Sequence, residues 1–170
     1  AARAGRCCRF NEDELRPLGR NSSGVRGISI EEDDEVVGAI AIHPEDSSVA
    51  VLVVSENGYG KRSPADEYRI TSRGAKGVKT INITDKTGPL VAIKSVTEEN
   101  DLMIITKSGL TIRVDMSEVR LSGRATQGVR LINLREGDAI AAVSPVDKSD
   151  EEEATETAAA DTNNDNQQLN

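Results

Sequence analysis

The chain has 170 residues, a formal net charge of −8 and only three aromatic side chains, two Tyr and one Phe. A core must therefore come from Val, Ile and Leu, and the β-branched members of this set favour sheet. No apolar run has the length of a membrane helix, and the first ten residues, "AARAGRCCRF", lack the apolar stretch of a signal peptide. Composition thus excludes a helical membrane protein, and we expect no membrane partner and a cytoplasmic location.

The residues with chemical potential are few. Cys7 and Cys8 are adjacent, and His43 is the only other soft ligand, so neither a disulfide framework nor a zinc site can be assembled. We expect two reduced thiols. No nucleophile and base stand at a plausible spacing, and the sequence therefore predicts no catalytic residue, no metal site and no cofactor in this segment.

One pattern occurs three times, as "GRNSSGVRGISI" from Gly19, "SRGAKGVKTINI" from Ser72 and "GRATQGVRLINL" from Gly123. The copies lie 53 and then 51 residues apart. Eight residue types recur at identical spacings, and in the first copy they are Gly5, Arg9, Glu14, Arg16, Arg20, Gly24, Val25 and Ile28. A repeat of roughly 50 residues predicts an array of similar units.

Each unit has the pattern of a set of short strands. The continuous apolar runs 48–58 and 101–109 end in turn signals and predict buried central strands. We expect the other strands, in chain order, at 28–30, 36–42, 60–64, 81–83, 89–96, 110–115, 132–134 and 138–146. The prediction is an all-β fold in which every repeat forms a four-stranded antiparallel blade, and blades pack face to face as in a propeller.

The predicted domain covers 1–146, with blades at about 1–45, 46–98 and 99–146. No apolar strand precedes Gly5, so the first blade is expected to lack its first strand, and the chain to be a fragment of a longer protein. Residues 147–170 hold eight acids and one Lys, which predicts a disordered acidic tail. Without the −7 of that segment, the remainder carries a charge near −1.

Cations gather in the repeated segment. Glycines there allow positive φ and close approach of the backbone, so the loops can present amides and cations to phosphates. Equivalent loops on successive blades would form a row that suits duplex DNA, since the aromatic platforms used for single strands are missing. The candidate DNA-binding residues are Arg20, Arg26, Arg73, Lys76, Lys79, Arg124 and Arg130. We place Arg26, Lys79 and Arg130 in the loop rather than in the following strand.

Other repeated residues have two interpretations. Arg16, Arg69 and Arg120 each follow a Glu by two positions, so a local ion pair and a DNA contact are equally open. Arg9, Arg62 and Arg113 are expected to be solvated or paired. Gly5, Gly58 and Gly109 are expected to be turn residues only.

The segment "GRCCRFNEDELRPLGRNSSGVRGISI", followed by "VVGAIAI", resembles the C-terminal domain of the A subunit of DNA gyrase, and the resemblance continues to about Val146. "TSRGAKG" at 71–77 resembles a degenerate form of that family's basic, glycine-rich box; the full box, which begins with Gln, is absent. The resemblance implies a β-pinwheel, usually of six blades, that wraps DNA for ATP-dependent negative supercoiling.

The resemblance also implies partners and cofactors outside this segment. They are the B subunit of gyrase and a second A subunit in an A2B2 holoenzyme, with ATP and Mg²⁺ used elsewhere in that holoenzyme, at the bacterial nucleoid. The break-forming tyrosine of the family lies in another domain, and Tyr59 and Tyr68 match no such motif.

Three alternatives stay open from the sequence. The domain could belong to topoisomerase IV and serve relaxation or decatenation. It could be a propeller-like scaffold for protein partners, with its cations neutralised by acids such as Glu31 to Glu35. Independently, the acids from Asp150 to Glu153 could compete with DNA for the cations.

Overall fold

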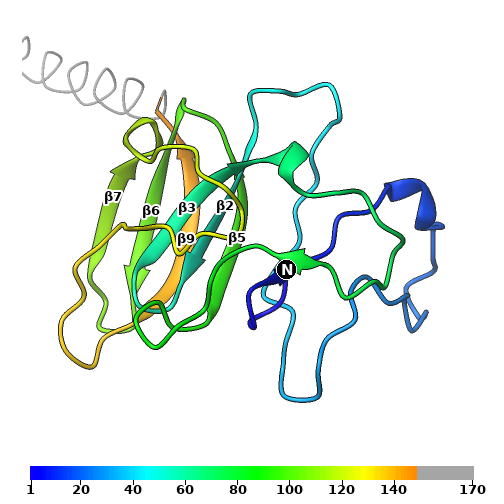
Figure 1. Ribbon diagram of the computed structural model, residues 1–170, viewed down its shortest axis with the longest axis horizontal. Helices are drawn as coiled ribbons and strands as arrows, with labels where there is room; N and C mark the ends of the chain where they lie inside the picture. The colour runs from blue at the N-terminus through cyan, green and yellow to red at the C-terminus, as the bar shows by residue number, and fades with distance from the viewer. Residues whose placement is uncertain (149–170) are drawn as a thin grey trace, which may run out of the picture.

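The computed structural model describes residues 1–148 and forms three antiparallel sheets joined by loops and short 3-10 turns (Figure 1). No α-helix occurs in this part of the chain, and the all-β, antiparallel prediction is confirmed. The strands are β1 (Arg6–Cys7), β2 (Ala50–Ser55), β3 (Tyr59–Pro64), β4 (Val78–Lys79), β5 (Leu90–Val96), β6 (Asn100–Thr106), β7 (Thr111–Asp115), β8 (Val129–Arg130) and β9 (Ile140–Asp147). The 3-10 turns are η1 (Glu12–Glu14), η2 (Ala65–Glu67) and η3 (Met116–Glu118).

The two continuous apolar runs form the centres of the two larger sheets. One sheet has the order β5-β2-β3-β8 and the other the order β7-β6-β9, so β2 and β6 are central as predicted. On β2, Leu52 and Val54 face a core shared with the second sheet, whereas Val51 and Val53 face a core shared with the first repeat. Both faces of β2 are thus buried, which explains why its sequence does not alternate.

Strands are exchanged between neighbouring repeats. β8, from the third repeat, pairs with β3 of the second, with Tyr59 opposite Arg130 and Gly60 opposite Val129. β4, from the second repeat, pairs in the same register with β1 of the first. The β2–β3 sheet has four antiparallel strands as predicted, but its fourth strand comes from the following repeat and not from the same one.

Glycine makes this exchange possible. Gly128 has a φ of +82°, and a Cβ there would lie 2.5 Å from the carbonyl oxygen of Gly60. The equivalent Gly77 has a φ of +70°, and its Cβ would lie 2.3 Å from the oxygen of Cys7. Only glycine allows this conformation together with this approach, so these repeated glycines serve the strand exchange.

The alternating segments 28–30, 81–83 and 132–134 are not strands, contrary to prediction. Ile81 and Ile132 are buried, whereas Ile28 and Ile83 are half-buried and Ile30 is exposed. Ile132 packs on the preceding repeat, since a Cβ on Gly58 would lie 2.9 Å from both its Cγ2 and its backbone oxygen. Gly58 therefore does more than form a turn. Apolar and polar residues alternate in this segment because of packing on the preceding repeat, and not because the segment pairs as a strand. The short strand that does pair ends just before it.

The predicted strand at 36–42 is also absent, apart from one bridge between Ala2 and Val36. β5 and β9, its counterparts, pair with the central strands β2 and β6. The first repeat has no such central strand among the described residues, and a strand needs a ladder partner. Val37, Ile40 and Ile42 nevertheless pack against the core beside β2.

The expected blade boundaries remain approximate descriptions of the sequence repeat. At the C-terminal side β9 continues to Asp147, and Lys148 pairs with Asp115 at 2.8 Å. The rest of the predicted acidic tail, residues 149–170, lies outside the described residues.

Candidate nucleic-acid interface

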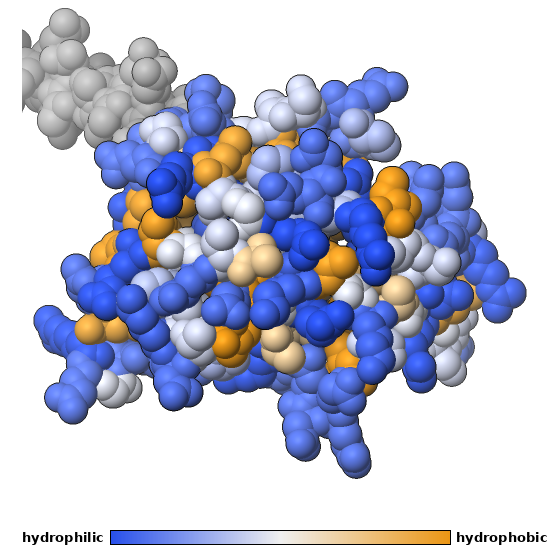
Figure 2. All heavy atoms as spheres, in the orientation of Figure 1, coloured by the Kyte–Doolittle hydropathy of each residue, from blue (hydrophilic) through white to orange (hydrophobic). Residues whose placement is uncertain are grey.

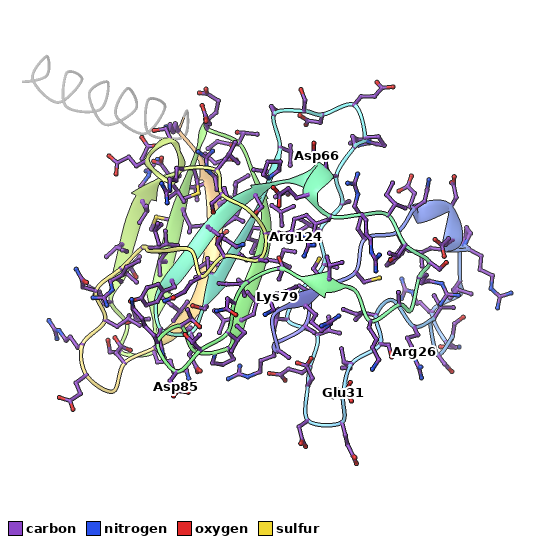
Figure 3. All side chains as sticks on the ribbon, in the orientation of Figure 1. Arg26, Glu31, Asp66, Lys79, Asp85 and Arg124 are labelled. Atoms are coloured by element: carbon purple, nitrogen blue, oxygen red, sulfur yellow. The ribbon has the colours of Figure 1, made fainter. Side chains whose placement is uncertain are left out.

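The loop arginine of one repeat contacts a cationic residue of the repeat before it. Nη1 of Arg73 donates to the backbone oxygen of Arg26 at 2.8 Å, and Nη1 of Arg124 donates to the backbone oxygen of Lys79, also at 2.8 Å. Figure 3 shows Lys79 and Arg124 close together near the centre of the molecule. Neighbouring repeats thus bring their candidate residues together in pairs rather than scattering them.

A glutamate of the preceding repeat holds each of these loops. Oε2 of Glu14 accepts from the backbone amide of Arg73 at 2.8 Å, and Oε2 of Glu67 accepts from that of Arg124 at 3.0 Å. Within residues 1–148 the local Glu-x-Arg ion pair is not formed in any repeat, and Glu14 and Glu67 bind the following repeat instead. Arg16, Arg69 and Arg120 are exposed, and they make no hydrogen bond or ion pair within residues 1–148.

Lys79 and Arg130 lie in strands, so their predicted placement in the loop is wrong; Arg26 lies outside any strand. Each of the two strand residues contacts the Asn three positions on, Lys79 to Asn82 at 3.3 Å and Arg130 to Asn133 at 3.0 Å. Both side chains are exposed. β8 lies at the edge of its sheet opposite β5, so Arg130 stands in an edge strand.

Lys61 is a functional candidate that the sequence pattern did not reveal. Its side chain is 1% exposed, and its ammonium donates to the carbonyl oxygens of Gly123, at 2.6 Å, and Arg124. Burial lowers the pKa of Lys61 to about 8, the carboxylate of Glu67 partly restores it, and the charge of Arg124 lowers it further. The equivalent residue of the first repeat, Cys8, directs its sulfur to the backbone oxygen of Ser72. Because the repeats share no residue type at this position, only the structure identifies Lys61 as a buried cation.

The arginines Arg9 and Arg62 connect repeats and do not face solvent freely. Nη1 of Arg9 donates to the carbonyl oxygens of Ala65, at 2.6 Å, and Tyr68, at 3.1 Å. Nε of Arg62 donates in the same way to Val119, and Arg113 pairs with Asp101. The expectation that these arginines are solvated or paired is thus met by pairing, mainly with backbone.

Acidic partners of the candidate residues are scarce. Lys76 lies 3.5 Å from Glu31, but the two side chains are 75% and 84% exposed, and such pairs contribute little. Within residues 1–148, Arg20, Arg26, Lys79 and Arg130 form no ion pair. The positive charge of the segment is therefore largely available to an external anion. We call Arg20, Arg26, Arg73, Lys76, Lys79, Arg124 and Arg130 the cation row.

The face of the molecule in Figure 2 is largely hydrophilic, with hydrophobic residues in small separate areas. Two exposed apolar residues stand at equivalent positions, Ile70 and Leu121, directly after Arg69 and Arg120. None of the three aromatic side chains is exposed. The described part of the chain offers no stacking platform for bases.

Other chemistry is not evident in the described part of the chain. Residues 1–148 contain no group of three or more His, Cys, Asp or Glu side chains that could hold a metal ion. Cys7 and Cys8 are free thiols. None of the described helices is long and apolar enough to cross a membrane.

Comparison with known proteins gives consistent results. A relative from Staphylococcus aureus (strain NCTC 8325), named as the A subunit of DNA gyrase, is 49% identical over 148 residues, which cover 87% of this chain but only 17% of the relative. A solved structure of a DNA gyrase A C-terminal domain has a TM-score of 0.77 and 27% identity over 85% of this chain and 48% of that one. The C-terminal domain of a DNA topoisomerase IV has a TM-score of 0.79 over 86% of this chain and 45% of the other, at 18% identity, which shows a shared fold alone.

A family model described as "DNA gyrase C-terminal domain, beta-propeller" matches residues 2–43, 50–97 and 100–147. These three segments correspond to the three repeats, and together they span most of the described residues. The chain therefore belongs to the DNA gyrase C-terminal domain family, whose fold is a β-propeller.

Proposed function

We propose that this domain binds duplex DNA without sequence preference along the cation row and wraps it, as the C-terminal domain of the A subunit of a DNA gyrase. The observation that carries the proposal is the contact of Arg73 with Arg26 and of Arg124 with Lys79, which repeats with the same geometry. Equivalent cations thereby follow one another from repeat to repeat, and such an arrangement suits a regularly spaced polyanion.

Duplex is the preferred substrate for two reasons. The aromatic side chains are not exposed, so the base stacking that drives single-strand binding has no platform here. No recognition helix is present in residues 1–148, so these residues have no helix that could contact bases in the major groove. Phosphate contacts combined with DNA bending remain, as in other proteins that bind without reading bases.

The activity of the whole enzyme follows as part of the proposal. This segment would support ATP-dependent negative supercoiling in a holoenzyme of two A and two B subunits, in the bacterial cytoplasm at the nucleoid. It needs no cofactor itself, and ATP and Mg²⁺ act on other parts of that holoenzyme. The 49% identity to a gyrase A subunit supports gyrase over topoisomerase IV, to which the likeness extends only to the fold.

Salt-dependent binding of the full chain to a labelled duplex of about 40 bp tests the proposal. Arg26→Ala, Lys79→Ala and Arg130→Ala remove exposed cations, and each should reduce the slope of log K against log [salt] by about 1. Lys94→Ala is the matched control, because Lys94 lies on β5 at the opposite edge of the sheet, about 14 Å from β8.

A duplex affinity that does not depend on salt concentration, or that is unchanged in all three variants, would reject DNA wrapping. In that case, crosslinking of the same positions to a protein but not to DNA would support the scaffold alternative. If the proposal holds, the three substitutions combined in the intact A subunit, in complex with the B subunit, should abolish negative supercoiling while ATP-independent relaxation persists.

A further inference from the structure

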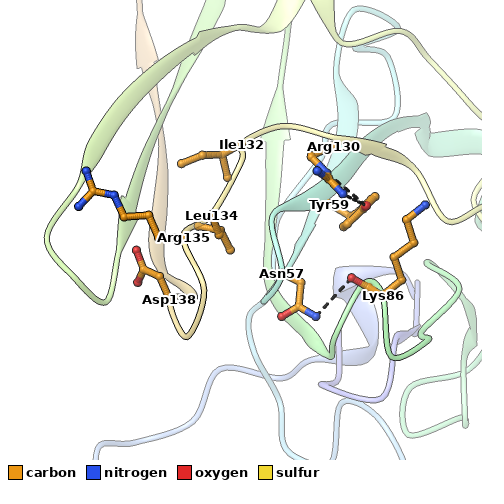
Figure 4. Close-up of a pocket in the computed structure, with 8 residues that line it drawn as sticks. All are labelled: Asn57, Tyr59, Lys86, Arg130, Ile132, Leu134, Arg135 and Asp138. Carbon is orange, nitrogen blue, oxygen red and sulfur yellow. Dashed lines mark hydrogen bonds between the residues drawn. The ribbon is translucent and has the colours of Figure 1, made fainter.

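A hollow of about 280 Å³ lies beside the junction of β3 and β8, and we call it the Tyr59 hollow (Figure 4). Its polar lining includes Asn57, Tyr59, Lys86, Arg130 and Asp138. A third cation, Arg135, lines it from the loop before β9, and two aliphatic side chains complete the wall. Three cations and one carboxylate therefore converge here, and only one of the cations, Arg130, belongs to the cation row.

Tyr59 and Arg130 form the most ordered part of this lining. The Tyr59 hydroxyl accepts hydrogen bonds from Nε of Arg130 at 3.2 Å and from Nη2 at 2.8 Å. Asn133 fixes Nη1 of the same guanidinium at 3.0 Å. Since the phenol oxygen accepts twice, its own proton remains to be donated. The hydrogen bond from Arg130 lowers the pKa of Tyr59, which makes the hydroxyl a stronger donor.

Lys86 and Arg130, the basic groups nearest the Tyr59 ring, form no ion pair with an acidic side chain of residues 1–148. Nζ of Lys86 and Cζ of Arg130 each lie 5.4 Å from the centroid of the Tyr59 ring, which attracts cations through its π electrons. Within residues 1–148, neither Lys86 nor Arg135 forms an ion pair. The acids adjacent to them in sequence, Asp85 and Glu136, are exposed and do not line the hollow.

The one lining carboxylate is already occupied. Asp138 accepts from the amide of Ser108 at 3.0 Å, from the Ser108 hydroxyl at 2.6 Å and from the amide of Ala139 at 2.9 Å. These hydrogen bonds, that of the Ser108 hydroxyl foremost, lower the pKa of Asp138 to about 2. Asp138 is thus committed to the loops around Ser108, and it balances only one of the three positive charges.

We propose that the Tyr59 hollow binds one phosphoryl group of duplex DNA, with Tyr59, Lys86, Arg130 and Arg135 as donors. The inference rests on the proposed function and extends the cation row beyond Arg130 to the loops at 84–89 and 131–139. It is particular to the second repeat. In the first repeat Arg6 replaces Tyr59 and donates to the backbone of Lys76 and Gly77, and in the third Leu110 takes the position.

Two measurements on the full chain test the site. The first is duplex affinity of the double variant Lys86→Ala/Arg135→Ala, which should fall about tenfold with a salt slope reduced by about 1 for the lost phosphate. The matched control is Lys94→Ala, which should bind like the wild type. Lys86 and Arg135 are exposed, so the unfolding midpoint of the double variant should be unchanged, and this is checked by urea unfolding.

The second measurement is the ¹³Cζ resonance of Tyr59, which reports the phenol environment directly. The chain has only one other tyrosine, Tyr68, which is buried and hydrogen-bonded to Thr80, so it serves as an internal reference. Duplex should shift the Tyr59 resonance in the wild type, but not in the double variant. The same titration with inorganic phosphate alone distinguishes a site for free anions.

The outcomes separate the two proposals. A chain that binds duplex no better than a neutral control overturns the proposed function together with this site. Normal duplex affinity in the double variant, with an unmoved Tyr59 resonance, overturns the phosphate site alone. A resonance that responds to inorganic phosphate but not to duplex also overturns it, because the ligand would then be a free anion.

Discussion

The ammonium of Lys61 lies 2.6 Å from the carbonyl oxygen of Gly123, beneath the loop that carries Arg124. A buried cation thus supports the backbone of an outer loop whose own arginine is positive. The arrangement keeps two like charges near each other, and within residues 1–148 they are compensated by backbone oxygens and the carboxylate of Glu67.

Titration of Lys61 should appear in the stability of the chain. Its pKa of about 8 in the folded state lies below the usual 10.5, so between these values the unfolded chain binds more protons. The free energy of unfolding of the wild type, relative to Lys61→Met, should therefore rise by about 3 kcal/mol from pH 7.5 to 10.5. Urea unfolding at several pH values measures this difference, and a difference independent of pH contradicts it.

Gly128→Ala should destabilise the chain because the new Cβ would meet the backbone of Gly60 at 2.5 Å. We expect a loss of about 3 kcal/mol or more in the free energy of unfolding. Gly24→Ala is the matched control: Gly24 holds the equivalent position with a φ of +75°, but has no atom within 4 Å of its Cβ. It carries only the backbone strain and should cost about 1 kcal/mol. Equal losses in both variants would mean that strand exchange contributes nothing.

Glu67→Ala should weaken duplex binding even though it removes a negative charge from the DNA-binding side. The carboxylate holds the amide of Arg124, and its loss releases the loop, so we expect affinity to fall about threefold to tenfold. Glu118→Ala is the control at the equivalent position of the third repeat, and it should leave affinity unchanged or raise it slightly. If both variants bind more tightly, charge alone decides and the loop needs no support.

The adjacent cysteines should differ in reactivity. Cys7 is buried in β1 and its pKa is raised, mainly by burial, whereas the sulfur of Cys8 is partly accessible beside Thr71. Iodoacetamide at neutral pH should label Cys8 first, and Cys7 should react only when β1 separates from β4. Mass spectrometry of the labelled peptide measures the order, and simultaneous labelling of both thiols would show that β1 is open in the folded chain.

The sequence was sufficient to predict the strands at the centres of the two larger sheets. The runs that became β2 and β6 were predicted as central strands, because length and β-branched content distinguish such strands from helices. The repeat predicted that Arg73 and Arg124 hold equivalent places in a row of loops, but it did not predict their contacts with the backbone of Arg26 and Lys79. What could not be predicted was the partner of β8, since nothing in the sequence of a repeat says whether Val129 pairs within its own unit or with Gly60 of the previous one.

The same limit explains the residues that were misplaced or missed. Lys61 occupies a position held by Cys8 and Ile112 in the other repeats, so no shared pattern marks it as a buried group. The Glu-x-Arg spacing left a local ion pair and a DNA contact equally open, but the partner of Glu67 is 57 residues away, and such distant contacts depend on how repeats dock. Tyr59 and Arg130 meet across 71 residues for the same reason.

Pairing of β8 with β3 means that the structural module is offset from the sequence repeat. If the chain is divided at about residue 98, the N-terminal piece lacks β8, the outer strand of its sheet, and the C-terminal piece carries β8 without its partner β3. A graft that ends after Arg130 would carry an intact sheet, and duplication or deletion of a blade should likewise be registered to that strand.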